Sequence, residues 1–99
     1  MIRHVIMGNF KVEITPEWRD RFIQKAEEAL AQVPGTHNVH MGKASEIQGK
    51  NPYDLALFID FDDETAFRAY QNHPLHNTVA EQIPAVLGEV ARFNFSLLG

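Results

Sequence analysis

The sequence predicts an α+β domain in which one four-stranded antiparallel sheet is covered on one face by helices. Its 99 residues are enough for one hydrophobic core. Segments with strand-like alternation and helix-like periodicity follow one another in the order β-α-β-β-α-β, and a proline interrupts the second helical segment. We therefore expect residues 1–99 to form a single domain whose second helix is split.

The first half of the chain is expected to form a strand, a helix and a second strand. Residues 2–12 are mostly apolar or β-branched on both alternating faces, which is typical of a strand buried on both sides. Thr15-Pro16 marks a helix start, and apolar residues then recur at spacings of three and four until Pro34-Gly35 ends the helix. Residues 36–47 alternate but are more polar, which favours an edge strand.

The second half is expected to form a strand, a split helix and a last strand. Residues 53–61 alternate as a strand, after which Asp62 or Asp63 caps a helix over residues 64–72. His73-Pro74 interrupts this helix, and Pro74 opens another that runs to about residue 85. Residues 90–98 complete the set, so the order matches the ferredoxin-like plan.

Both faces of this sheet are expected to be covered. The strand over residues 53–61 is aliphatic and aromatic on one face, yet Ala56 and Phe58 stand on the other. Helices cover only one face, and a bare apolar face of several hundred Å² is more than soluble monomers usually expose. The sequence therefore predicts a homodimer in which two sheets pack face to face as an α/β barrel.

Composition excludes several function classes. Thirteen Asp and Glu against nine Lys and Arg give a net charge of −4, which disfavours nucleic acid as a partner. The absence of Cys excludes disulfides, thiolate metal sites and Cys nucleophiles. No apolar run is long enough to span a membrane, and the N-terminus turns polar too early for a signal peptide, so a cytoplasmic protein that does not bind a membrane is expected. No cofactor is expected either.

The stretch Tyr70-Gln71-Asn72-His73-Pro74-Leu75-His76 carries the most chemical information. If Pro74 opens a helix, His76 lies on the same stripe as Val79 and faces the sheet. His4 shares its strand face with Ile6 and is expected to meet His76 there. A phenol and an imidazole in an apolar pocket can act as general acid and base.

Structural roles are open for the same residues. His73 precedes a proline and is favoured as a helix cap. His76 and His4 can equally be buried residues that satisfy their hydrogen bonds, and Tyr70 can be a packing residue. Two His without a carboxylate or Cys pattern do not predict a metal site. His37 and His40 are expected on opposite strand faces, where they cannot chelate together.

The sequence resembles the stress-responsive dimeric α/β-barrel (Dabb) family over essentially its whole length. The similarity lies in Ile2-Arg3-His4-Val5-Ile6, in Phe10-Lys11, in Thr15 at the helix start, and above all in Tyr70-x-x-His73-Pro74-x-His76. The resemblance implies a homodimer of ferredoxin-like subunits with a pocket between the sheet and the helices of each.

The resemblance also implies site residues. A plant polyketide cyclase of this family has an acid/base pair that matches Tyr70 and His76, and a pocket His that matches His4. Gly8, Ala26 and Leu87 replace larger pocket residues of that enzyme, so the pocket shape must differ. The residues expected to contact the ligand are His4, Ile6, Phe22, His73 and Val79, with Tyr70 and His76 as catalytic residues.

The expected function is the binding of a small, carbonyl-bearing and largely apolar molecule, with cyclase- or lyase-like acid/base chemistry. One alternative is a non-catalytic stress-associated homo-oligomer in which the His residues are structural. A second is a monooxygenase-like dimeric barrel, for which Asn9 and Trp18 are present but a Trp in the second helix is missing.

Overall fold

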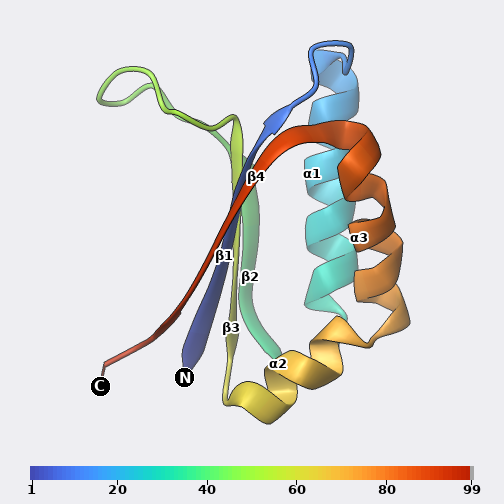
Figure 1. Cartoon of the computed structure of the whole chain (residues 1–99), viewed down its shortest axis with the longest axis vertical. Helices are drawn as coiled ribbons and strands as arrows, with labels where there is room; N and C mark the ends of the chain where they lie inside the picture. Colours follow the sequence, from blue (N-terminus) through green and yellow to red (C-terminus); the bar gives the residue numbers. More distant parts are fainter. Residues whose placement is uncertain (99) are drawn as a thin grey trace.

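The computed structural model describes residues 1–98 and has the expected ferredoxin-like order of elements (Figure 1). The helices lie together on one face of the sheet, and the second helix is split at His73-Pro74 as expected. The elements are β1 (Ile2–Phe10), α1 (Pro16–Ala31), β2 (Thr36–Lys43), β3 (Leu55–Phe61), α2 (Glu64–Gln71), α3 (Pro74–Val86) and β4 (Leu87–Ser96). No helix within the described residues is long and apolar enough to cross a bilayer.

The sheet has the strand order β2-β3-β1-β4, with every neighbouring pair antiparallel. The more polar β2 lies at an edge, as its sequence predicts, while β1 and β3 are central. Opposite residues of antiparallel strands share a face, so the register decides which side chains meet. His4 of β1 lies between Ile59 of β3 and Asn94 of β4.

Each helix begins at a residue whose side chain accepts a backbone N–H of the first turn. These N-caps are Thr15 for α1, Asp63 for α2 and His73 for α3, with donor–acceptor distances of 3.3, 2.9 and 3.1 Å. Such caps satisfy N–H groups that have no partner within the helix. His73 therefore restarts the helix that Pro74 interrupts.

An arm over residues 44–54 joins β2 to β3 and shortens both strands relative to expectation. β2 ends at Lys43 instead of residue 47, and β3 begins at Leu55 instead of residue 53. The Ala44 N–H donates to the Asp54 carbonyl at 2.7 Å and closes the base of the arm. Figure 1 shows the arm projecting from the sheet on the side away from the helices.

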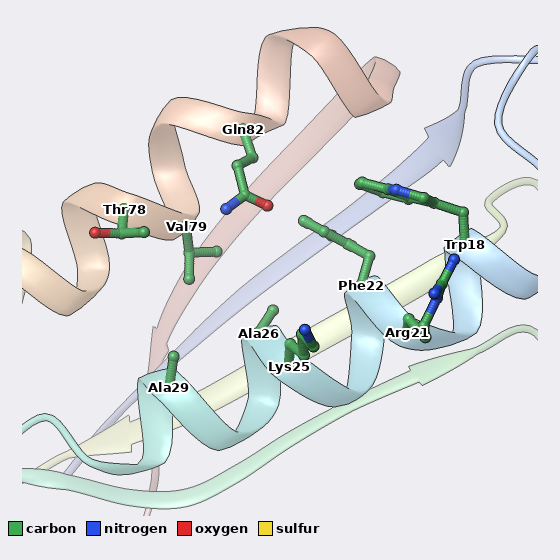
Figure 2. A pocket seen from close by; sticks show the side chains of 9 residues that line it. All are labelled: Trp18, Arg21, Phe22, Lys25, Ala26, Ala29, Thr78, Val79 and Gln82. Atoms are coloured by element: carbon green, nitrogen blue, oxygen red, sulfur yellow. The ribbon is translucent and has the colours of Figure 1, made fainter.

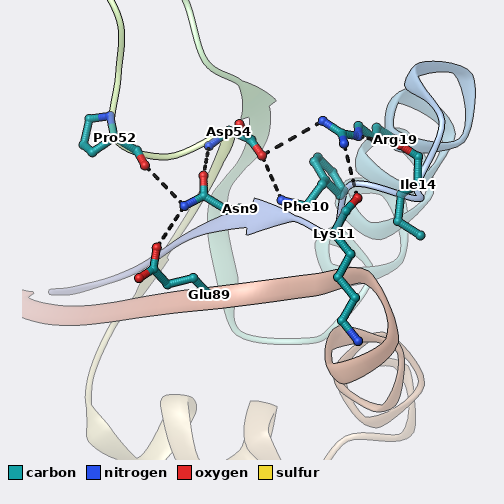
Figure 3. A network of polar contacts seen from close by, with 8 residues as sticks. All are labelled: Asn9, Phe10, Lys11, Ile14, Arg19, Pro52, Asp54 and Glu89. Carbon is teal, nitrogen blue, oxygen red and sulfur yellow. Dashed lines mark hydrogen bonds and ion pairs between the residues drawn. The ribbon is translucent and has the colours of Figure 1, made fainter.

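A polar network fixes the base of the arm to its neighbours (Figure 3). The Asn9 side-chain amide donates to the Pro52 carbonyl at 3.3 Å and to the Glu89 carboxylate at 3.0 Å. The Asp54 carboxylate lies 4.0 Å from the Arg19 guanidinium, and the Asp54 N–H donates to the Asn9 side-chain carbonyl at 3.1 Å. The network thus connects the arm with β1, β4 and α1.

The outer ends of β1 and β4 also differ from expectation. β1 ends at Phe10 instead of residue 12, because the Phe10 N–H donates to the Asp54 carboxylate at 2.9 Å and Val12 is 93% exposed. β4 begins at Leu87 instead of residue 90, because Leu87 pairs with Phe10 and is buried.

A bulge in β2 overturns one expectation about the histidines. Asn38 has a φ of 52°, and the register with β3 shifts between His37 and His40. His37 pairs with Asp60 and His40 with Phe58, so the two imidazoles lie on the same face of the sheet. The expectation of opposite faces was wrong because a bulge adds one residue and reverses the alternation.

The core lies between the helices and the sheet. It is formed by the inward faces of β1 and β3, the apolar stripe of α1, and residues of α2 and α3. Its largest fully buried hydrophobic side chains are Tyr70, Phe61, Leu30 and Ile59.

The opposite face of the sheet, called here the bare face, is apolar and carries no helix. Its apolar residues include Val5, Met7, Phe58, Phe93 and Phe95. Phe93 is 63% exposed and packs on Phe95 with ring centroids 5.9 Å apart. Beside them, Arg3 donates two hydrogen bonds of 2.7 and 2.8 Å to the Asp60 carboxylate.

Candidate functional site

A cavity of about 350 Å³ lies between the sheet and helices α2 and α3. β1 contributes His4 and Ile6 to its wall, and α3 contributes His76 and Val79. α2 contributes Tyr70, which is only 2% exposed. Five of the seven residues expected at the site therefore line one cavity.

Strand register places a polar pair at one end of the cavity. His4 lies opposite Asn94, and its Nδ1 is 2.5 Å from the Asn94 side-chain carbonyl oxygen. Both side chains belong to the face of the sheet that carries the helices. An Nδ1–H donated to Asn94 leaves Nε2 of His4 with a free lone pair.

His4 is held toward its neutral form. It is 7% exposed, and burial lowers the pKa of its imidazole below the ordinary value of 6.5. The hydrogen bond with Asn94 acts in the opposite direction, while the nearby charge of Arg92 and a protonated His76 would lower the pKa further. Burial is the largest of these effects.

Tyr70 and His76 face each other across the break between α2 and α3. Tyr70 lies in the last turn of α2 and His76 in the first turn of α3, and their ring centroids are 4.6 Å apart. Burial raises the pKa of the Tyr70 phenol far above its usual value of 10.0, so the hydroxyl keeps its proton. His76 Nδ1 lies 3.2 Å from the Asn77 side-chain carbonyl oxygen. A proton on Nδ1 there leaves Nε2 as the basic nitrogen.

Aliphatic side chains close the other end of the cavity. Leu55, Ile83 and Leu87 lie there, and Leu87 covers Gly8. A Cβ on Gly8 would lie 2.9 Å from Leu87 Cδ1, closer than carbon atoms normally approach. The small residue in β1 is therefore matched by the position of Leu87.

The two remaining expected residues lie elsewhere. His73 does not line the cavity, because its Nδ1 is used to cap α3. Phe22 is buried on α1 and stacks on Trp18, with ring centroids 5.6 Å apart and an interplanar angle of 12°. Both aromatic residues line a second, outer cleft of about 380 Å³ between α1 and α3 (Figure 2).

Arg92 and Asn94 are polar residues of the cavity wall that were not anticipated from the sequence. Arg92 and Asn94 of β4 line the cavity next to Ile6 and His4, which are their partners in the register. Alternation in the last strand places these two side chains on one face. Which face that is depends on the pairing with β1, which the sequence pattern alone does not specify.

The residues considered for a monooxygenase-like site do not meet in the cavity. Asn9 belongs to the network at the base of the arm, and Trp18 lies in the outer cleft (Figures 2 and 3). Neither residue lines the cavity that contains His4.

Together, these observations define a ferredoxin-like domain with a cavity between its sheet and helices that is lined by His4, Tyr70 and His76. The family described as the stress responsive A/B barrel domain matches residues 2–97, so the chain belongs to this family. This confirms the resemblance seen in the sequence. No curated protein matches the chain significantly.

Solved structures share the fold over nearly the whole chain. A dimeric ferredoxin-like protein of unknown function from Thermobifida fusca is 30% identical, with 97% of this chain and 90% of that chain covered and a TM-score of 0.86. A Dabb family protein from Mesorhizobium loti is 22% identical, with coverages of 99% and 97% and a TM-score of 0.84. The hydroxynitrile lyase of Passiflora edulis is 13% identical, with coverages of 95% and 90% and a TM-score of 0.82. At 22% and 13% identity, the likeness concerns the fold alone.

Proposed function

We propose that this protein is a homodimer that binds a small, carbonyl-bearing and largely apolar molecule in the cavity of each subunit, where Tyr70 and His76 perform acid/base chemistry. The observation that carries the proposal is the approach of these two rings to 4.6 Å in one cavity. The cavity volume of about 350 Å³ is near the lower end of the range for small-molecule sites, roughly 300–1,000 Å³.

The proposed step is the removal of a proton from the carbon next to a carbonyl. His76 Nε2 accepts this proton, and the electron pair of the broken C–H bond moves into the carbonyl to form an enolate. The Tyr70 hydroxyl donates a hydrogen bond to the enolate oxygen, which stabilises the charge as it develops. Tyr70 can do so because its raised pKa keeps it protonated at neutral pH. Neutral His4 helps to orient the carbonyl compound.

Dimerisation is proposed through the bare face. Phe93 and Phe95 are exposed there on the edge strand, beside the central Val5 and Phe58. The T. fusca protein, 30% identical, is described as dimeric. A second copy would remove this apolar surface from water without covering the cavity, which lies on the other face.

The test is enzyme-dependent exchange of protons next to a carbonyl. With 2-tetralone in D₂O, loss of the α-proton signals is followed by NMR with and without protein. We expect His76→Ala to lower any acceleration by about 10²-fold or more, and Tyr70→Phe by about 10-fold or more. Tyr53→Phe is the matched control, because Tyr53 does not line the cavity, and it should behave as wild type.

The outcomes separate the proposal from the alternative of a non-catalytic protein. Exchange that is accelerated by the wild type and lost in both cavity variants supports acid/base catalysis. Exchange that is unaffected by either substitution contradicts the assignment of Tyr70 and His76. Binding of 2-tetralone without any acceleration supports a binding protein instead of an enzyme.

A further inference from the structure

Arg92 is the one permanently charged side chain in the wall of the cavity. The wall residues within the described part of the chain include no Asp or Glu, and Arg92 forms no ion pair with any residue from 1 to 98. The other polar residues of the wall are His4, Tyr70, Gln71, His76 and Asn94, none of which carries a fixed charge. A cavity with one cation and no carboxylate is electrostatically suited to a monoanion.

The register places this cation beside the acid/base cluster. Arg92 lies opposite Ile6, two residues along the strands from the His4–Asn94 pair and on the same face of the sheet. The aliphatic end of the cavity, with Leu55 and Leu87, begins on the other side of Arg92 along the sheet. Arg92 therefore lies between the end of the cavity that holds His4 and the aliphatic end, and a bound molecule that spans both ends would pass it.

The electrostatic influence of Arg92 on the cluster supports this placement. Its charge is one of the causes that lower the pKa of His4. Such an effect requires that the guanidinium be near the imidazole and incompletely screened by solvent. An anion bound at Arg92 would lie in the same neighbourhood.

We propose that Arg92 anchors a carboxylate, so that the ligand of this cavity is a small oxo-carboxylate with an apolar body. The inference rests on the proposed function and adds a charge requirement to it. The planar guanidinium can donate two parallel hydrogen bonds to a carboxylate, which fixes orientation as well as position. One Arg among neutral groups suits a single negative charge better than a phosphate dianion. The anchored molecule then presents its carbonyl to Tyr70 and His76.

The test compares two probes of the same shape and different charge. Affinities of 2-naphthoate and 2-naphthamide are measured by calorimetry for the wild type, Arg92→Met and Arg92→Lys. We expect the wild type to bind the carboxylate about tenfold or more tightly than the amide. Arg92→Met should remove this preference, because the carboxylate loses far more affinity than the amide, and Arg92→Lys should retain part of it.

Arg21→Met is the matched control. Arg21 is an exposed arginine of the outer cleft, so its substitution changes the net charge equally without touching the cavity (Figure 2). We expect it to leave both affinities at the wild-type level. Loss of naphthoate binding in Arg21→Met instead of Arg92→Met would place the anion in the outer cleft and overturn the inference.

The remaining outcomes distinguish the inference from the proposed function. Equal wild-type affinities for acid and amide would overturn the carboxylate anchor and leave the acid/base proposal standing if 2-tetralone exchange is accelerated. Absence of binding by either probe, together with no acceleration of exchange, would overturn both. Because Arg92 is exposed on an edge strand, its variants should fold, and the amide serves as an internal check that the cavity is intact.

Discussion

Replacing Gly8 by alanine should destabilise the protein, because the added methyl group would overlap atoms at the start of β4. A Cβ at this position would lie 2.9 Å from Leu87 Cδ1 and 3.0 Å from the Glu89 carbonyl oxygen. Unstrained carbon contacts are about 3.5–4.0 Å, so the added methyl overlaps Leu87 by about 0.6 Å or more. Leu87 is 4% exposed, and the Glu89 oxygen is backbone beside the β1–β4 pairing. Neither can move without disturbing the sheet edge or the cavity.

The magnitude follows from two opposing effects. Overpacking of a tight core position costs about 1–3 kcal/mol, whereas Gly→Ala gains about 0.4–1 kcal/mol by restricting the unfolded chain. With the middle of each range, the net loss is about 1.3 kcal/mol. At about 4–8 °C per kcal/mol for a domain of this size, the Tm should fall by about 5–10 °C. Thermal unfolding followed by circular dichroism, at one fixed protein concentration because of the proposed dimer, measures this shift.

Gly88→Ala is the control for this substitution. It makes the same chemical change in β4, where the nearest atom to an added Cβ would be Lys11 Cγ at 3.9 Å, an ordinary contact. Its Tm should stay equal to that of the wild type or rise slightly. Leu87→Ala supplies a second check, because the Gly8→Ala penalty should shrink in that background. An unchanged or higher Tm for Gly8→Ala, or an equal penalty in both backgrounds, would refute the packing argument.

Three further predictions concern pH and assembly. His4, whose buried imidazole has a lowered pKa, should titrate below 6.5 in an NMR titration; stability should therefore fall as pH drops from about 6.5 toward the His4 pKa, since only the unfolded chain gains the proton there. A His4 midpoint at or above 6.5 would contradict the burial argument. The Arg3 guanidinium holds the pKa of the Asp60 carboxylate below 3.8, so this pair should stabilise the fold above about pH 4 and lose its effect as pH falls further. Asp60→Asn should therefore weaken the pH dependence of the denaturation midpoint in this acid range. An unchanged pH dependence would argue against the pair. Phe93→Glu should make the free energy of the proposed dimerisation less favourable by about 2 kcal/mol or more, as measured by light scattering across a concentration series. Val12→Glu, at an exposed site outside the sheet, should leave it unchanged.

The candidate site was only partly predictable from the sequence. Pro74 fixes where the second helix breaks, so the approach of Tyr70 and His76 follows from local rules. Arg92 was not anticipated, because its place beside the cavity depends on the β1–β4 register. That register pairs residues that are 77 to 94 positions apart in the sequence, and no local pattern encodes it.

The β2 bulge shows the same limit. Alternation from Thr36 onward predicts opposite faces for His37 and His40, and one residue with positive φ at Asn38 reverses the result. The lost strand residues of the arm have a similar origin, since the Asp54 side chain and backbone bind β1 and Ala44 instead of extending β3.

The sequence by itself determined the order of elements, the helix starts, the split at Pro74 and the family, because capping, proline geometry and hydrophobic periodicity act over a few residues. The tertiary structure decided which faces the strand residues occupy, which side chains share the cavity, and that Arg92 and Asn94 belong to its wall. These depend on register and packing between distant segments, where a shift of one residue moves every side chain to the other face of the sheet.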